Sequence, residues 1–310
     1  MSQKSIVIAG GGLTGALAAL MLARDGHRVS LYERRGDIRN AEIVHGRSIN
    51  LAISTRGLTA LDRVGLKEKV LEMAVPMRGR LMHGKDRSTT FQAYSSDPNE
   101  NIYSISRGGL NRFLIEQAAA EENVDLHFLH RCEEVDARAG VATFKNDENG
   151  ETVEVSGDLL IGADGAYSAV RKNLMVGDQF DFSQEYLTHG YMELYLPAAK
   201  GGEFPIEKNA LHIWPRGHFM MIALPNDDGS FTGTLFWPNK GDGAFSHLKD
   251  ADQVNRYFAE WFPDVPDLIP DLEKQYLDAN PSSLVTIRCR PWVVGKTVLV
   301  GDSAHAIVPF

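Results

Sequence analysis

The sequence predicts an α/β protein in which a parallel-sheet domain is interrupted by a β-rich domain and then resumed. Three observations predict this. A short apolar strand, a glycine-rich turn, a helix and a second strand follow one another before residue 34. Aromatic segments of alternating polarity then occupy residues 185–240, and a short apolar strand returns at Thr297–Gly301.

The first elements form a βαβ unit. Ser5–Ala9 is a β-branched apolar run of the kind found in fully buried strands. Ala16–Arg24 predicts a helix of small and aliphatic residues, and Gly26 is placed to end it as a C-cap glycine. Val29–Glu33 predicts the second strand. The whole unit therefore takes about 30 residues, as a βαβ motif requires.

The later elements are predicted from the same signals. We expect helices at Leu110–Glu121 and at Val254–Phe262, the second closed by Pro263. An Asn149-Gly150 pair favours a type I′ hairpin between two of the expected strands. The further strands are expected at Asp125–Leu129, Val141–Phe144, Thr152–Val155 and Leu159–Gly162, and those of an antiparallel sheet at Tyr186–Leu196, Ala210–Trp214, Phe219–Leu224 and Phe231–Trp237.

Composition and charge exclude several classes of protein. The chain has 310 residues, of which 43% are hydrophobic and 24% charged, as in an ordinary globular protein. Its net charge of −9 argues against non-specific binding to nucleic acid or to an anionic membrane. Two cysteines cannot form a disulfide framework, and no run of apolar residues is long enough to span a membrane. We therefore expect a cytoplasmic protein with no membrane segment.

The glycine-rich turn is the first candidate site. Gly10 to Gly15 match G-x-G-x-x-G: Gly10 would permit the tight turn, Gly12 the approach of a pyrophosphate, and Gly15 the close packing of helix on strand. Glu33 ends the next strand, where a carboxylate can accept hydrogen bonds from both ribose hydroxyls of an adenosine. Such a carboxylate disfavours a 2′-phosphate, so the nucleotide would be FAD or NAD. The alternative is a purely structural glycine turn.

Two further motifs follow buried strands. The segment Gly162–Arg171 contains Asp164 before a glycine, which alone would be a common turn. The segment Gly301–His305 contains Asp302 and Ser303, either of which could cap a helix. A Ser/His catalytic pair is a poor alternative there, because no G-x-S-x-G elbow is present.

In this order and spacing, the three motifs resemble those of the FAD-dependent aromatic hydroxylases, which are single-component flavoprotein monooxygenases. The resemblance implies a Rossmann-like FAD-binding domain interleaved with a β-rich substrate domain, and it implies no separate NADPH-binding domain. It assigns the FAD-binding domain to residues 1–75, 100–178 and 290–310, and the substrate domain to residues 76–99 and 179–289. It also assigns roles: the ADP part of FAD to Gly10, Gly12, Gly15 and Glu33, the flavin pyrophosphate and the path of the reductant to Asp164, and the ribityl chain to Asp302.

Further segments are similar to the branch of this family that acts on L-kynurenine. These are Gly46–Ile53, Pro76–His83, Tyr103–Asn111, Phe182–Tyr186, Leu211–Arg216 and Ala306–Phe310. By this resemblance, Arg80 and Tyr94 hold the carboxylate of the substrate. The remaining cofactor residues that it implies are Arg34 and Arg35 beside the adenosine, Arg107 at the flavin, and Ala52.

The activity that the resemblance implies is hydroxylation of L-kynurenine to 3-hydroxykynurenine, with FAD as cofactor and NADPH and O2 as cosubstrates. The ring is electron-rich, so we expect position to matter more than a general acid or base, and we name no catalytic residue. The alternatives are another FAD-dependent aromatic hydroxylase, or an inactive flavin-binding fragment. The last arises because relatives continue beyond this point into a helical C-terminal region, which is absent here.

The histidines give no metal site. His127 and His130 fall in one expected strand, where a spacing of three places them on opposite faces. His212 alternates with Trp214 and is expected in the core or lining a pocket. No cluster of cysteines or carboxylates has the spacing of metal ligands.

Overall fold

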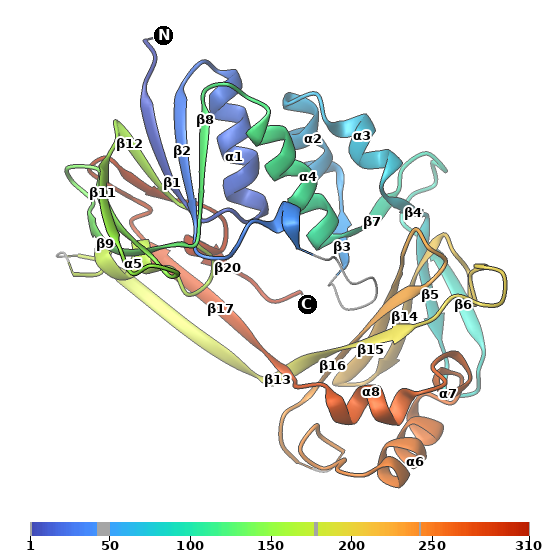
Figure 1. The fold of residues 1–310 in the computed structure, drawn as a ribbon. Coiled ribbons are helices and arrows are strands. Elements are labelled where there is room, and N and C mark those ends of the chain that lie inside the picture. Colours follow the sequence, from blue (N-terminus) through green and yellow to red (C-terminus); the bar gives the residue numbers. More distant parts are fainter. Residues whose placement is uncertain (1, 42–49, 177–178, 242, 310) are drawn as a thin grey trace. The chain divides into compact units, whose positions relative to one another are not determined.

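The computed structural model describes residues 2–41, 50–176, 179–241 and 243–309 (Figure 1). Part of the segment Gly46–Ile53, and Phe310, therefore lie outside the described residues. The chain divides into two compact units: the first consists of Met1–Glu42, Gly109–Tyr186 and Val285–Phe310, and the second of Ile43–Gly108 and Leu187–Leu284. None of the helices in the described ranges is long and apolar enough to cross a membrane.

These units divide the chain at other positions than the predicted domains. Residues 43–75 and 100–108, assigned to the FAD-binding domain, fall in the second unit. Residues 179–186 and 285–289, assigned to the substrate domain, fall in the first. Compactness does not decide which residues bind flavin, so the predicted domain assignment stays a prediction.

A largely parallel sheet forms the centre of the first unit (Figure 1). The strand β1 lies between β2 and β12 and is parallel to both, and four of its five residues are buried. This is the two-sided burial that its continuous apolar sequence predicts. The strand order is β18 (Val293–Val294), β19 (Thr297–Leu299), β12 (Leu159–Gly162), β1 (Ser5–Ala9), β2 (Arg28–Glu33) and β8 (Val124–Phe128).

The helix α1 (Leu13–Arg24) packs against β1 and β2. It ends as predicted, with Gly26 at a φ of 88°. The N–H of Gly26 donates to the carbonyl of Ala23 at 2.9 Å and that of His27 to Leu22 at 3.1 Å, which together form a Schellman motif. The other elements of this unit are η1 (Ile38–Asn40), α4 (Arg107–Ala119, which begins in the second unit), β9 (His130–Asp136), β10 (Val141–Asn146), β11 (Thr152–Ser156), α5 (Ala169–Leu174), the end of β17 (Ser282–Arg290), η2 (Gly301–Ser303) and β20 (His305–Ala306).

The hairpin between β10 and β11 is confirmed, but its predicted turn type is wrong. The strands pair in antiparallel register up to Lys145 and Thr152. A type I′ turn needs a positive φ at both central residues, and of Asn149 and Gly150 only the glycine has one. The N–H of Gly150 instead donates to the carbonyl of Asn146 at 2.9 Å, which closes a longer loop.

The predicted separation of His127 and His130 is also wrong. Leu129, between them, has a φ of 62°, so one strand ends before it and another begins after it. The alternation of faces fails at such a residue, and the two rings lie 6.0 Å apart. Both pack against Tyr32, at 4.4 and 5.8 Å between ring centroids. Within the described ranges, no group of three His, Cys, Asp or Glu residues could hold a metal ion.

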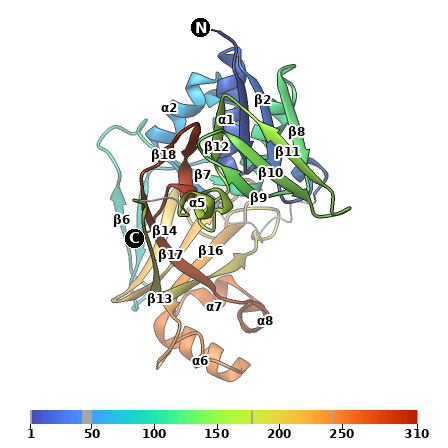
Figure 2. The ribbon, with the colours of Figure 1, turned by 90° about the vertical axis from the view of Figure 1, so that its left-hand side faces the viewer.

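The second unit contains a mainly antiparallel sheet, as the alternating segments predict (Figure 2). Among the strand pairs of the described residues in this unit, β14 and β5 are the parallel one. One face carries a core rich in aromatic side chains, against which three short helices pack: α6 (Ala251–Trp261), α7 (Val265–Leu268) and α8 (Leu272–Asp278). The strand order is β13 (Asp181–Leu196, which begins in the first unit), β16 (Phe231–Pro238), β15 (Phe219–Pro225), β14 (Ala210–Arg216), β5 (Gly79–His83) and β6 (Thr89–Ala93).

A smaller sheet completes this unit. The strand β7 (Ile102–Ser106) pairs with β3 (Asn50–Ile53) and with β4 (Val75–Met77), both in antiparallel direction. Two helices, α2 (Thr55–Arg63) and α3 (Lys67–Glu72), connect β3 to β4 along the chain.

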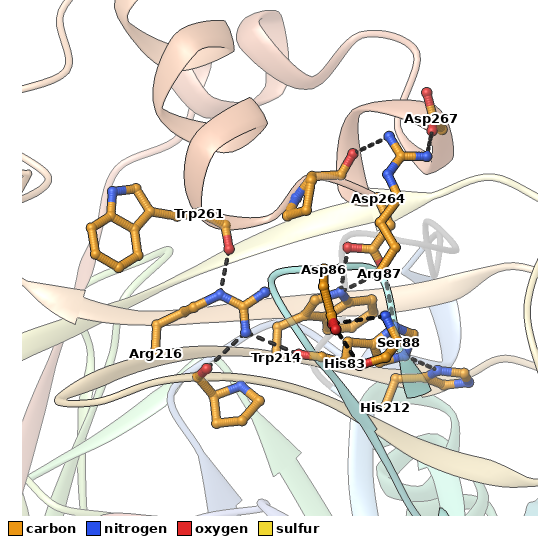
Figure 3. Close-up of polar contacts among 12 residues, drawn as sticks. His83, Asp86, Arg87, Ser88, His212, Trp214, Arg216, Trp261, Asp264 and Asp267 are labelled. Carbon is orange, nitrogen blue, oxygen red and sulfur yellow. Dashed lines mark hydrogen bonds and ion pairs between the residues drawn. The ribbon is translucent and has the colours of Figure 1, made fainter. Parts of the chain in front are cut away.

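A buried polar cluster joins β5, β14 and the residue before α7 (Figure 3). Asp264 accepts hydrogen bonds from the Nδ1 of His83 and the Nε1 of Trp214, both at 2.9 Å. The Nε2 of His83 lies 2.9 Å from the Nδ1 of His212, whose Nε2 lies 2.7 Å from the carbonyl of Glu207. A carbonyl only accepts, so His212 carries its proton on Nε2 and accepts from His83.

The pKa values of the cluster follow from this arrangement. Burial lowers the pKa of His212 to about 4. Burial alone would raise the pKa of Asp264, but hydrogen bonds from His83 and Trp214 outweigh it and lower the pKa. His212 is therefore neutral and Asp264 ionised at neutral pH. The expectation that His212 belongs to the core is confirmed.

We predict that this cluster makes the stability of the second unit depend on pH. His212 titrates near 6.5 when unfolded and near 4 when folded, so the unfolded chain binds one more proton between these values. Stability falls as the pH drops, by about 2 kcal/mol between about pH 7.5 and about pH 5 from this group alone. Urea unfolding followed by tryptophan fluorescence measures it, because three of the four tryptophans belong to this unit: Trp214, Trp237 and Trp261.

The control is a pair of variants. His212→Gln keeps a donor near the Glu207 carbonyl but has no titrating group, so its loss of stability at low pH is expected to be smaller by the same amount. His305→Gln changes an exposed histidine and is expected to behave as the wild type. An equal pH dependence in all three proteins would contradict the assignment.

Candidate functional site

The glycine-rich turn lies between the end of β1 and the start of α1, and two of its glycines are required by packing. Gly10 has a φ of 107°, and a Cβ there would lie 2.4 Å from the carbonyl oxygen of Ala163. A Cβ on Gly15 would lie 1.9 Å from the carbonyl oxygen of Gly10. Neither position can carry a side chain without moving the backbone.

Gly12 is different, because packing does not require it. It is the N-cap of α1, with an ordinary φ of −70°, and no atom of the described residues lies within 4 Å of where its Cβ would be. Among these residues, the turn is therefore open beside Gly12, at the N-terminus of α1. The first-turn N–H groups of a 12-residue helix face that space with the positive end of its dipole. These residues fit a bound pyrophosphate.

Glu33 ends β2, as predicted, and its side chain contacts the glycine-rich turn. Its side chain is only 9% exposed, and its Oε2 accepts the N–H of Gly11 at 2.7 Å. Its Oε1 accepts both the backbone N–H and the Nε of Arg35 at 2.9 Å. Burial alone would raise the pKa of Glu33, but these hydrogen bonds lower it. The carboxylate is thus ionised, and its remaining lone pairs can accept from ribose hydroxyls. The neighbouring Arg34 is exposed.

Asp164 directs its carboxylate into the protein. It accepts hydrogen bonds from the N–H groups of Ala169 and Val170 at the start of α5, at 2.7 and 3.1 Å. It also accepts from the hydroxyls of Ser168 and Ser303, at 2.5 and 3.0 Å. The carboxylate therefore organises the turn after β12. The role at the pyrophosphate that the resemblance implies stays a prediction.

The third motif lies against the first two. A Cβ on Gly301 would lie 2.8 Å from the Oγ1 of Thr14, so the Gly301 backbone approaches the first turn of α1. The Oγ of Ser303 accepts the N–H of Gly165 at 2.9 Å. Asp302 itself is exposed, in η2. The fold thus brings together the three motifs that the sequence singled out, although 139 residues separate Asp164 from Ser303.

Sequence reasoning missed two residues of this site. Arg171, only 4% exposed, donates from Nη1 to the carbonyl of Ser303 at 2.8 Å and from Nη2 to that of Ala166 at 2.5 Å. Its place at the end of the second motif was the available signal. Asn111 on α4 donates from Nδ2 to the carbonyl of Gly11 at 3.2 Å. It ends the segment Tyr103–Asn111 that carries the resemblance, but no sequence signal indicates that its side chain contacts the turn.

The second unit holds the predicted substrate pair. Arg80 extends from β5 and Tyr94 follows β6, with the guanidinium carbon 5.3 Å from the centre of the phenol ring. Burial raises the pKa of Tyr94, and a hydrogen bond from Arg80 opposes part of that rise. The phenol therefore stays protonated at neutral pH. The structure brings these two side chains together, and their role stays a prediction.

The other two predicted cofactor residues also belong to the second unit. Ala52 is exposed on β3, and Arg107 is exposed at the start of α4. Burial raises the pKa of Glu193, and the charge of Arg107 opposes that rise, so the two side chains interact. Their place at a flavin stays a prediction.

Comparisons with known proteins identify the family. A family model described as an FAD binding domain matches residues 3–310. The kynurenine 3-monooxygenase of Dictyostelium discoideum is 47% identical over 309 residues, which are 99% of this chain and 66% of that protein. That of Myxococcus xanthus (strain DK1622) is 46% identical over 309 residues, 99% of this chain and 67% of the relative. This chain thus spans about two thirds of the length of these relatives.

Solved structures show the same fold at low identity. A structure of 2-methyl-3-hydroxypyridine-5-carboxylic acid oxygenase matches with a TM-score of 0.77 at 23% identity. The match covers 100% of this chain and 77% of the oxygenase chain. For p-nitrophenol 4-monooxygenase PnpA from Pseudomonas putida DLL-E4 the TM-score is 0.74 at 17% identity. That match covers 99% of this chain and 74% of the monooxygenase chain. These confirm the predicted fold class, a Rossmann-like FAD-binding domain interleaved with a β-rich domain.

The family model accounts for nearly the whole chain, and the first unit of the structure supplies the open pyrophosphate cradle and buried carboxylate that FAD needs. The prediction of FAD as cofactor is thereby confirmed. The chain belongs to the FAD-binding domain family of flavoproteins, in which it is a relative of the kynurenine 3-monooxygenases.

Proposed function

We propose that this chain belongs to an FAD-dependent monooxygenase that converts L-kynurenine to 3-hydroxykynurenine with NADPH and O2. The observation that carries the proposal is the 46–47% identity to kynurenine 3-monooxygenases over 99% of the chain. The contact between Arg80 and Tyr94 supports it from the structure, because a guanidinium beside a phenol is a receptor for a carboxylate. The two cysteines are free thiols, and we include a cytoplasmic location in the proposal.

In this function the first unit holds the cofactor. When bound, FAD supplies the electron transfer and the oxygen chemistry that no side chain of the protein can perform. The N–H groups at the start of α1 would bind the pyrophosphate, where the absent side chain of Gly12 leaves room. Glu33, ionised and held by Gly11 and Arg35, would bind the ribose hydroxyls.

The second unit would hold the substrate by its amino-acid end. Arg80 would bind the carboxylate through its planar fork of donors. Tyr94 would donate a hydrogen bond from its hydroxyl to the same carboxylate, and its raised pKa keeps the hydroxyl protonated at neutral pH. Fixing the tail restricts the positions that the aromatic ring can take. For an electron-rich ring, that restriction contributes more than an added acid or base.

A hydroxylase of another aromatic compound is the second candidate. It is favoured by the solved structures of the same fold, which are named as oxygenases of a pyridine carboxylic acid and of p-nitrophenol. Oxidation of NADPH in the presence of kynurenine, compared with a series of phenolic acids, separates the two candidates. Stimulation by a phenolic acid and not by kynurenine would replace the proposal.

The glycine-rich turn allows cofactor binding to be separated from folding. We predict that Gly12→Ala leaves the melting temperature of the apoprotein within about 2 °C, because no atom of the described residues lies within 4 Å of the added methyl. The same methyl would occupy the pyrophosphate space and weaken FAD binding by roughly tenfold or more. Flavin fluorescence titration and thermal unfolding measure the two effects.

Gly15→Ala is the matched control. Its methyl would lie 1.9 Å from the carbonyl oxygen of Gly10, so this variant is expected to have a lower melting temperature even in the absence of FAD. FAD binding by Gly12→Ala as tight as that of the wild type would show that the pyrophosphate lies elsewhere.

The substrate pair gives a second prediction. Arg80→Ala should raise the KM for kynurenine by roughly tenfold or more, because a charge-assisted carboxylate contact is lost. The FAD content of the purified variant should not change. Arg78→Ala is the control, since Arg78 is also exposed, two residues before, and lines a cavity whose lining includes neither Arg80 nor Tyr94. Loss of bound FAD from Arg80→Ala, or an unchanged KM, would contradict the assignment.

A further inference from the structure

Two buried side chains hold the Gly11 residue, one on each of its peptide groups. Its N–H donates to the Oε2 of Glu33 at 2.7 Å, and its carbonyl accepts from the Nδ2 of Asn111 at 3.2 Å. Glu33 belongs to the same βαβ unit, whereas Asn111 comes from α4, 100 residues away. The carbonyl contact is therefore an additional constraint, made by tertiary structure.

This contact sets the direction of a donor on the next residue. In a trans peptide the carbonyl of Gly11 and the N–H of Gly12 point in opposite directions. Asn111 holds the carbonyl on one side of the turn, so the N–H of Gly12 points to the other side. Gly12 is the residue of the turn whose Cβ position has no atom of the described residues within 4 Å, and no described side chain caps the N-terminus of α1 there. Its N–H is one of the helix donors that have no partner within the helix.

The environment of Asn111 indicates that packing does not explain its presence. The side chain is 9% exposed, and its Oδ1 is buried without a hydrogen-bond partner among the described residues. A buried acceptor without a partner is destabilising, and an apolar side chain of similar size would avoid that cost, so the feature that Asn111 supplies here is its donor to the Gly11 carbonyl. Exchanging the two amide atoms would place Oδ1 against the Gly11 carbonyl, so the donor must face the turn.

We propose that Asn111 is a positioning residue for the pyrophosphate of the dinucleotide. By donating to the Gly11 carbonyl, it directs the Gly12 N–H toward the open space at the start of α1, where the diphosphate binds. This inference rests on FAD binding by the glycine-rich turn and adds a residue from outside the βαβ unit to it. Asn111 acts through the backbone of the turn and need not touch the cofactor.

The test compares two asparagines of the first unit. Asn123 also donates its Nδ2 to backbone carbonyls of the βαβ unit, those of Ala23 and His27 at 2.8 and 2.6 Å, but at the opposite end of α1. Asn111→Leu is expected to weaken binding of ADP and of FAD by about tenfold, the usual effect of one hydrogen bond. Asn123→Leu is expected to lower the melting temperature and to leave both affinities unchanged. Calorimetric titration of the wild type and both variants measures this.

A second variant and a second readout keep the test independent of stability. Asn111→Ala removes the same donor without added bulk, and is expected to lose affinity to the same degree. In both Asn111 variants the ³¹P resonances of bound ADP should shift from their wild-type positions, and in Asn123→Leu they should not. If both Asn111 variants bind ADP and FAD with wild-type affinity and leave the ³¹P resonances at their wild-type positions, the inference about Asn111 is overturned and the cofactor site is not. Failure of the wild type to bind either nucleotide would overturn the cofactor site as well.

Discussion

The close packing of the first turn of α1 on the end of β1 is the constraint on which the candidate site depends. The backbone of Gly15 lies directly against the carbonyl of Gly10. The Cα of Gly10 in turn lies close to Ala163, the residue after β12. Gly301 approaches the same turn from the end of β19. These contacts leave no room for side chains at Gly10, Gly15 and Gly301, whereas no atom of the described residues lies within 4 Å of the Cβ position of Gly12. A cofactor site is therefore a direct consequence of how tightly its surroundings pack.

Charged side chains in the first unit stabilise these turns through hydrogen bonds to the backbone. Glu33 binds the N–H of Gly11, and Asp164 binds the N-terminus of α5 together with Ser303. Arg171 donates to two carbonyls of the same region. Each group satisfies backbone atoms that the sharp turns after the strands leave without partners. These polar residues of the three motifs thus fix the conformation of the turns around the candidate site.

Local signals made most of the fold predictable. The strand Ser5–Ala9, the Schellman end at Gly26 and the antiparallel strands of the second unit all follow from short-range patterns. The positive φ of Leu129 was not predictable, because no glycine marks it. Neither was the contact of Asn111 with Gly11, which depends on the packing of a distant helix. The residues of the site that lie in sequence motifs were predictable. Single side chains that reach the site from distant elements, such as Asn111, were not.

The central claim is that the turn from Gly10 to Gly15 binds the ADP part of FAD through its backbone. Amide chemical shifts of the ¹⁵N-labelled chain, recorded while ADP is added, test it most directly. The account predicts that the largest changes fall on the turn, on the first residues of α1 and on the neighbours of Glu33. Large changes confined to other segments, or saturation with no change at Gly12, would contradict it.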